Sequence, residues 1–200
     1  MEKKKWSKEE KLAILNEAPA KRGEFTTRKV VLYISASLDG FIAKPGDDLS
    51  FLNAMEKEGE DYGYAAFTSQ VDTVIMGRKT FDWVFRAINN VPHPEKDTYI
   101  ITGKARAPIG KTQFFTGDVV ALVRKLKSQP GGIIYCDGGA QLANTLLRAG
   151  LMDELVVSVI PVLLGGGLRL FEEGIPERRM ELVSSKAYEM GLVQLHYRVG

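Results

Sequence analysis

Apolar runs that alternate with amphipathic segments constrain the fold of this chain most strongly, from Arg28 onward. The short runs rich in Val, Ile and Tyr read as buried strands, and the segments between them repeat apolar residues with helical spacing. This alternation predicts an open α/β sheet with mostly parallel strands, because each helix returns the chain across the sheet before the next strand begins. With 200 residues and 44% hydrophobic side chains, the chain is long enough to bury one such core.

The sequence predicts eight strands and four helices. The strands are expected near residues 29–36, 72–76, 97–102, 112–115, 132–136, 153–160, 180–187 and 192–199. The helices are expected near residues 59–70, 78–85, 118–128 and 139–149. A short turn, Glu189–Gly191, joins the last two strands. The expected fold is therefore a mixed, mostly parallel sheet flanked by helices, with an antiparallel hairpin at its carboxyl-terminal edge.

Residues 1–27 read as a separate extension before a domain at residues 28–200. The sequence predicts a helix over Lys8–Ala18, with Ser7 and Glu10 as its capping box, and a linker after it. The start of this segment resembles the first helix of insertion-element transposase helix-turn-helix proteins, without their second and third helices. One helix cannot present a supported recognition helix to DNA, so we do not expect nucleic-acid binding.

Charge and cysteine content limit which binding partners and which cellular compartment we expect for this protein. The net charge is +2, but the first 29 residues carry nine Lys/Arg against five Glu, which leaves the domain itself slightly acidic. A slightly acidic body gives no support for a nucleic-acid surface. The single cysteine, Cys136, lies in an apolar run and fits a reducing compartment. No run reaches the roughly 18 apolar residues of a membrane span, so we expect a cytoplasmic protein.

A glycine turn at the end of one predicted strand carries two cations and a hydroxyl. Gly77, Arg78, Lys79 and Thr80 follow the apolar run of residues 74–76 and open the next predicted helix. The first backbone N–H groups of a helix have no partner within it, so beside these cations they suit a phosphate group. The alternative is a solvated helix start that binds nothing.

Two other strand ends carry small or polar residues. The first strand runs into Ser37–Ala43, and the strand near residues 132–136 ends in Asp137–Leu142 just before a helix. Open α/β sheets bind ligands outside the carboxyl ends of their strands, so these segments should meet in one site.

Four segments resemble, in their residues and in their order along the chain, the dihydrofolate reductase superfamily. The resemblance is to the branch related to the reductase domain of bacterial riboflavin biosynthesis in particular. The segments are Ser37–Ala43, Val74–Thr80, Asp137–Leu142 with Leu146–Leu155, and Pro161–Phe171. The glycine-rich loop at residues 161–167 matches the riboflavin branch and departs from classical dihydrofolate reductases, which puts dihydrofolate itself in doubt as the substrate. The sequence contains no zinc-deaminase signature, so the bifunctional riboflavin enzyme is not expected as a whole.

The resemblance implies an NADPH-dependent reductase that transfers hydride to a C=N or C=O bond of a small pterin-like or ribosylaminopyrimidine-like heterocycle. The alternative is a non-catalytic nucleotide- or ligand-binding module of the same fold. We expect a homodimer, because relatives pair through sheet edges and an apolar edge such as Leu192–Leu195 needs covering. No metal is expected, since His93 and His196 lack metal-ligand spacing.

The resemblance also assigns cofactor contacts. The matched residues are Ser35, Ile42, Ala43, Gly77, Arg78, Lys79, Thr80, Thr102, Gly103, Lys104, Gly138, Gly139, Ala140, Gln141 and Leu142. The turn at Gly77 would hold the cofactor phosphates, and the segment at Lys104 would surround the adenosine ribose and its 2′-phosphate, which favours NADPH over NADH. Gly138 and Gly139 match a pair that relatives join by a cis peptide bond.

For catalysis, the resemblance points to Asp61 and Ser158. Asp61 matches the acid that assists substrate protonation in classical dihydrofolate reductases, and Ser158 matches a hydroxyl bonded to that acid. We therefore expect the two side chains to lie within hydrogen-bond reach, with a raised Asp61 pKa that allows proton relay. The alternative is that Asp61 belongs to a solvated acidic face.

A substrate loop is also implied beside the predicted cleft. Its expected members are Asp39, Leu164, Gly165 and Gly166. Glycines after an apolar strand allow a close approach of the backbone to a ligand.

Overall fold

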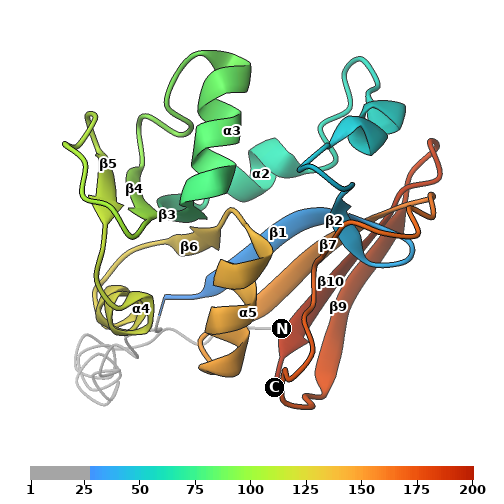
Figure 1. Cartoon of the computed structure of the whole chain (residues 1–200). Helices are drawn as coiled ribbons and strands as arrows, with labels where there is room; N and C mark the ends of the chain where they lie inside the picture. The colour runs from blue at the N-terminus through green and yellow to red at the C-terminus, as the bar shows by residue number, and fades with distance from the viewer. Residues whose placement is uncertain (1–27) are drawn as a thin grey trace, which may run out of the picture.

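The computed structural model describes residues 28–200, so the helix and linker predicted for residues 1–27 lie outside the described part of the chain. An eight-stranded sheet forms the centre of the molecule (Figure 1). Its strands are β1 (Val30–Ser37), β3 (Val71–Gly77), β4 (Asp97–Ile101), β5 (Thr112–Phe115), β6 (Ile133–Cys136), β7 (Glu154–Ile160), β9 (Met180–Ala187) and β10 (Val193–Val199). A two-stranded ribbon joins β2 (Phe41–Ala43) to β8 (Leu168–Arg169).

The strand order in the main sheet is β5-β4-β3-β6-β1-β7-β10-β9. All neighbours from β5 to β7 pair in parallel, whereas β10 is antiparallel to both β7 and β9. The predicted mostly parallel sheet of eight strands with an antiparallel carboxyl-terminal hairpin is thus confirmed.

Helices cover both faces of the sheet (Figure 1). One face carries α2 (Tyr64–Thr68) and α3 (Arg78–Ile88), and the other carries α4 (Val119–Lys127) and α5 (Ala140–Arg148). A short 3-10 helix, η1 (Ser50–Met55), follows β2. The sequence did not predict η1 or the short β2–β8 ribbon.

Strand β3 shows why the parallel strands read as continuous apolar runs. Val74, Ile75 and Met76 are fully buried. Val74 and Met76 belong to the core cluster that contains Phe81 of α3, while Ile75 belongs to the cluster that contains Leu122 of α4. Both faces of the strand are covered by helices, so both sets of alternating side chains must be apolar.

The helix predicted over residues 59–70 is wrong in extent, because only the five residues of α2 are helical. Gly59, Tyr62 and Gly63 have φ angles of +78°, +55° and +85°. A right-handed helix cannot contain such residues, so the chain turns until Tyr64. Asp61 therefore lies in a turn and not on a helix.

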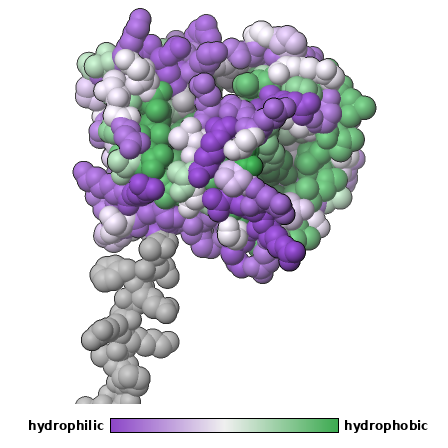
Figure 2. All heavy atoms as spheres, turned by 60° about the horizontal axis from the view of Figure 1, so that its bottom comes forward, coloured by the Kyte–Doolittle hydropathy of each residue, from purple (hydrophilic) through white to green (hydrophobic). Residues whose placement is uncertain are grey.

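The open edge next to the carboxyl terminus is β9, and not the Leu192–Leu195 segment. Leu192 is buried and Val193–Val199 form β10, which has β7 on one side and β9 on the other. All eight residues of β9 are exposed, including Leu182 and Val183. Figure 2 shows hydrophobic surface gathered on the side where Figure 1 places β9 and β10. Among residues 28–200, no helix is long and apolar enough to cross a membrane.

Candidate cofactor-binding cleft

A cleft of about 1200 Å³ opens at the carboxyl ends of the parallel strands. Residues at the ends of β3 and β4, the turn after β6, and the first turns of α3 and α5 line it. This is the edge at which open α/β sheets bind their ligands, because the loops that follow the strands converge there.

The cleft contains fourteen of the fifteen residues predicted to contact a cofactor, and the exception is Lys104. The grouping follows from the parallel sheet, which brings the carboxyl ends of β1, β3, β4 and β6 to one side. Contact of these residues with a cofactor stays a prediction.

The first turns of α3 and α5 meet in this cleft. No side chain caps either helix start, and neither first turn contains an acid. In contrast, Asp118 caps α4 by accepting a hydrogen bond from the Val120 N–H at 2.8 Å. The two uncapped starts therefore present free N–H groups and the positive ends of two helix dipoles to the same space. A diphosphate group fits this set of donors.

Two hydrogen bonds hold the helix starts together. The Gly77 N–H donates to the Gly138 carbonyl at 3.0 Å, and the Gly139 N–H donates to the Thr80 hydroxyl at 3.2 Å. Residues 28–200 contain no cis peptide bond, so the cis bond implied between Gly138 and Gly139 is absent. The turn is made instead by a φ of +95° at Gly138, which side-chain-bearing residues rarely adopt.

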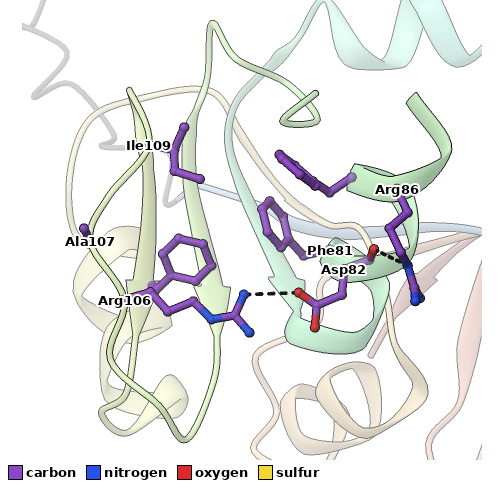
Figure 3. Close-up of a pocket in the computed structure, with 8 residues that line it drawn as sticks. Phe81, Asp82, Arg86, Arg106, Ala107 and Ile109 are labelled. Carbon is purple, nitrogen blue, oxygen red and sulfur yellow. Dashed lines mark hydrogen bonds and ion pairs between the residues drawn. The ribbon is translucent and has the colours of Figure 1, made fainter. Parts of the chain in front are cut away.

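Cations line the end of the cleft along α3. Arg78 pairs with Asp82 at 2.5 Å, and Arg106 pairs with the same carboxylate at 3.2 Å. Lys79 and Arg86 form no ion pair within the described residues, although Arg86 Nε donates to the Asp82 carbonyl (Figure 3). The sequence prediction missed three of these residues. Asp82 could have been found four residues after Arg78, and Arg86 four residues after Asp82, because such residues share one face of a helix. Arg106 lies on a loop, where no such spacing could point to it.

The Asp61–Ser158 hydrogen bond predicted from the sequence is wrong. The exposed Asp61 carboxylate accepts hydrogen bonds from the N–H groups of Gly63 and Ala65, both at 2.9 Å. These bonds, first the one from Ala65, lower the Asp61 pKa, which is opposite to the expected rise. Ser158 is buried and accepts a 3.1 Å hydrogen bond from Gln194, which lies opposite it in β10. Neither Asp61 nor Ser158 lines the cleft.

A different acidic residue, Asp137, lines the cleft directly after β6. Asp137 Oδ1 accepts a 2.6 Å hydrogen bond from the Tyr135 hydroxyl, and Oδ2 lies 3.4 Å from His93 Nε2. Burial raises the Tyr135 pKa well above its usual range, so this hydroxyl stays protonated and donates. The other acids that line the cleft differ, because Asp82 and Glu172 pair with arginines and Asp47 is exposed.

Three of the residues predicted for a substrate loop, Asp39, Leu164 and Gly165, form a structural clamp outside the cleft lining. Asp39 accepts hydrogen bonds from the Ser37 hydroxyl at 2.6 Å, from the Leu164 N–H at 3.1 Å and from the Gly165 N–H at 2.7 Å. These bonds, first the one from Ser37, lower the Asp39 pKa to about 2. The clamp ties the glycine-rich loop to the turn after β1. Asp39, Leu164, Gly165 and Gly166 do not line the cleft, so their contact with substrate stays a prediction.

The described chain shows no metal site, since residues 28–200 contain no group of three or more His, Cys, Asp or Glu placed to hold an ion.

Comparison with known proteins identifies the family. The family model of the RibD C-terminal domain matches residues 28–194. The uncharacterized protein YwjB of Bacillus subtilis (strain 168) is 39% identical over 171 residues, which cover 85% of this chain and 97% of that protein. The crystal structure of a candidate riboflavin biosynthesis protein from Shewanella sp. PV-4 has a TM-score of 0.77 at 29% identity, and the match covers 86% of this chain and 99% of that one.

The fold is also that of a classical reductase. Dihydrofolate reductase from Enterococcus faecalis, complexed with NADP(H) and RAB-propyl, has a TM-score of 0.62 at 15% identity, and the match covers 88% of this chain and 98% of that one. At this identity the likeness concerns the fold alone. The protein described here has a dihydrofolate reductase-like fold and belongs to the RibD C-terminal domain family.

Proposed function

We propose that this protein is an NADPH-dependent reductase that transfers a hydride to a C=N or C=O bond of a small heterocycle. The meeting of two uncapped helix starts in one cleft carries the proposal, because that arrangement suits the diphosphate of a dinucleotide. Family membership supports it, and so does the dihydrofolate reductase-like fold, which in the Enterococcus faecalis protein was solved with NADP(H).

The cleft offers a distinct environment to each part of such a cofactor. The N–H groups at Arg78–Thr80 and at Ala140–Leu142 would hold the diphosphate. The apolar side chains of Ile34, Ile42 and Ala43 line another part of the cleft and would pack against the flat nicotinamide ring. When bound there, the nicotinamide would supply the hydride.

Asp137 is our candidate for the group that holds the proton. Asp137 lines the cleft beside the Gly138–Gly139 turn, whereas Asp61 does not line it. The Tyr135 hydroxyl fixes one carboxyl oxygen, and His93 lies beside the other. A carboxyl held in one rotamer at the edge of a cleft can deliver a proton to a substrate nitrogen or oxygen during reduction.

A substrate screen tests the proposed activity. The full chain is mixed with NADPH and either folates or ribosylaminopyrimidines, and the loss of NADPH absorbance is followed. We expect substrate-dependent oxidation by the native protein and by Asp61→Asn, and much slower oxidation by Asp137→Asn. NADPH binding without oxidation in any mixture would favour the alternative, a non-catalytic ligand-binding module of the same fold.

We also propose the cellular compartment and the binding partner of this activity. The only cysteine of the chain, Cys136, is a buried free thiol, which suits the reducing cytoplasm. The proposed partner is a small-molecule substrate, and the slightly acidic body gives no reason to propose a nucleic acid.

A further inference from the structure

A histidine lies next to Asp137 without lining the cleft. His93 Nε2 is 3.4 Å from Asp137 Oδ2, and the same nitrogen is 3.4 Å from the hydroxyl of Tyr64 in α2. The other carboxyl oxygen, Oδ1, accepts the hydrogen bond from the Tyr135 hydroxyl. Because Asp137 lines the cleft and His93 does not, the carboxyl connects the cleft to a histidine outside it.

The loop between α3 and β4 is anchored in a way that holds this histidine. Pro92 and Pro94 flank His93, and Pro92 is buried. Lys96 Nζ donates to two backbone carbonyls at the end of α2 and the start of β3, at 3.0 Å and 2.9 Å. The Lys96 N–H also donates to the His93 carbonyl at 3.0 Å. Since proline fixes its own φ angle, the loop has little freedom to move the imidazole away from Asp137.

The titratable side chains that face His93 come from three parts of the chain. Tyr64 belongs to α2, Tyr135 and Asp137 lie at the end of β6, and Glu95 lies on the same loop as His93. Burial raises the pKa of Tyr64 and that of Tyr135 above the usual range, so both hydroxyls stay protonated. Histidine is the side chain that most readily exchanges a proton near neutral pH. His93 is therefore the neighbour from which Asp137 can take a proton.

The proposed reaction consumes a proton at Asp137 in every cycle. Reduction of a C=N or C=O bond takes a hydride from NADPH and a proton from the acid, which leaves a carboxylate. The Asp137 side chain is only 20% exposed, and a bound cofactor and substrate would exclude water from the cleft. A route for protons that does not pass through the cleft would restore the acid while the cleft is occupied.

We propose that His93 is a positioning residue that returns a proton to Asp137 after each reduction. The Nε2–H bond of the His93 imidazolium breaks, an O–H bond forms at Asp137 Oδ2, and the neutral imidazole then takes a proton from water. Only a proton moves in this step, so it needs no reactant besides water. The inference rests on the proposed function, because Asp137 needs a new proton only if the protein reduces a substrate.

Chemical rescue tests the proposal on the full chain. His93 has a φ of +52°, which glycine adopts readily, so His93→Gly removes the imidazole without straining the loop. The assay uses NADPH and the folate or ribosylaminopyrimidine that the native protein reduces. For His93→Gly we expect kcat to fall about 10²-fold, the lower end of general acid–base effects, with KM and the Kd for NADPH unchanged. Imidazole added to the solution should restore kcat toward the native value.

The pH profile separates proton supply from support of the loop. The native kcat should fall as the pH rises past neutral, where histidines lose their proton, and His93→Gly should lack this decrease. His196→Gln is the matched control and should keep the native profile, because His196 contacts Glu154 at 2.9 Å and does not line the cleft. A His93→Gly variant that has a lowered kcat, keeps the native profile and does not respond to imidazole would overturn the proposal.

Nuclear magnetic resonance of the histidine ring nitrogens tests the contact without turnover. In the native protein, Nε2 of His93 should carry a proton, and its signal should change in Asp137→Asn because the carboxylate partner is lost. The signals of His196 should stay the same in that variant. A His93 ring with its proton on Nδ1 alone would contradict the proposed transfer to Asp137.

The outcomes also separate this inference from the proposed function. If Asp137→Asn slows reduction but His93→Gly keeps the native kcat, the proton has another source, so this inference is wrong and the proposed function stands. If Asp137→Asn keeps the native kcat, the role of His93 fails together with that of Asp137, although the protein is still a reductase. If the native protein reduces no substrate, the proposed function and this inference both fail.

Discussion

The Tyr135 hydroxyl donates a 2.6 Å hydrogen bond to Asp137 where β6 ends and the cleft begins. Because Tyr135 is buried, it holds the carboxyl of Asp137 in one orientation beside the Gly138–Gly139 turn. This relationship places an acid at the cleft and links the core of the sheet to the proposed chemistry.

Replacing this acid should slow reduction without weakening cofactor binding. For Asp137→Asn we expect kcat to fall about 10²- to 10⁴-fold, the usual contribution of a general acid. The Kd for NADPH should stay unchanged, because the diphosphate donors are intact. Asp47→Asn is the matched control, since Asp47 also lines the cleft but is exposed. Equal kcat values for the native protein and Asp137→Asn would exclude Asp137 as the proton-holding group.

Removing a cation at the start of α3 should reduce the preference for NADPH. Arg78 and Lys79 both line the cleft, and their charges favour the additional phosphate of NADPH over the hydroxyl of NADH. For Arg78→Ala and for Lys79→Ala, we expect the difference in binding free energy between the two nucleotides to shrink by about 1–3 kcal/mol. Calorimetry with both nucleotides measures this difference, and equal binding by the native protein would contradict the assignment.

The Asp39 clamp should make stability depend on pH in acid. The folded-state pKa of Asp39 is lowered to about 2, so its ionised form stabilises the fold above the unfolded pKa of about 4. This contribution is lost as the pH falls from about 4 to about 2. Asp39→Asn should therefore lower Tm at pH 7, and the difference in Tm from the native protein should shrink in that range. Ser37→Ala, which removes the hydroxyl donor, should show a smaller version of the same change. A difference in Tm that persists unchanged into strong acid would contradict this account.

The exposed strand β9 is the expected contact of a homodimer. Its side chains are all exposed, and Leu182 and Val183 are apolar residues on an open sheet edge. Such an edge tends to pair with another strand unless it is covered. Light scattering should report a dimer at micromolar concentration for the native protein and a monomer for Leu182→Lys. A native monomer at that concentration would refute the prediction.

The sequence predicts the fold and the position of the cleft for one physical reason. Parallel strands place their carboxyl ends on the same side, so the motifs at Gly77–Thr80 and Asp137–Leu142 had to meet wherever their strands were neighbours. Continuous apolar runs also predict the central strands such as β3, because helices cover both faces of the sheet there.

Features that depend on irregular backbone could not be predicted in the same way. The turn at Gly59–Gly63 has left-handed residues that shorten the helix and direct Asp61 toward α2. His93, with a φ of +52°, and Arg106 both reach their partners from loops whose path no periodicity describes. The site found in the structure differs from the predicted one at these residues, because their positions depend on irregular backbone.

Transfer of a labelled hydride tests the central claim most directly. The native protein is supplied with NADPH that carries deuterium at the reactive carbon of the nicotinamide, together with the folate and ribosylaminopyrimidine substrates, and the products are analysed by mass spectrometry. If the protein is a reductase, deuterium should appear at the reduced carbon of one product, at a rate that falls in Asp137→Asn and stays unchanged in Asp61→Asn. NADPH that binds tightly but passes no deuterium to any substrate in the panel would contradict a reductase and indicate a ligand-binding module.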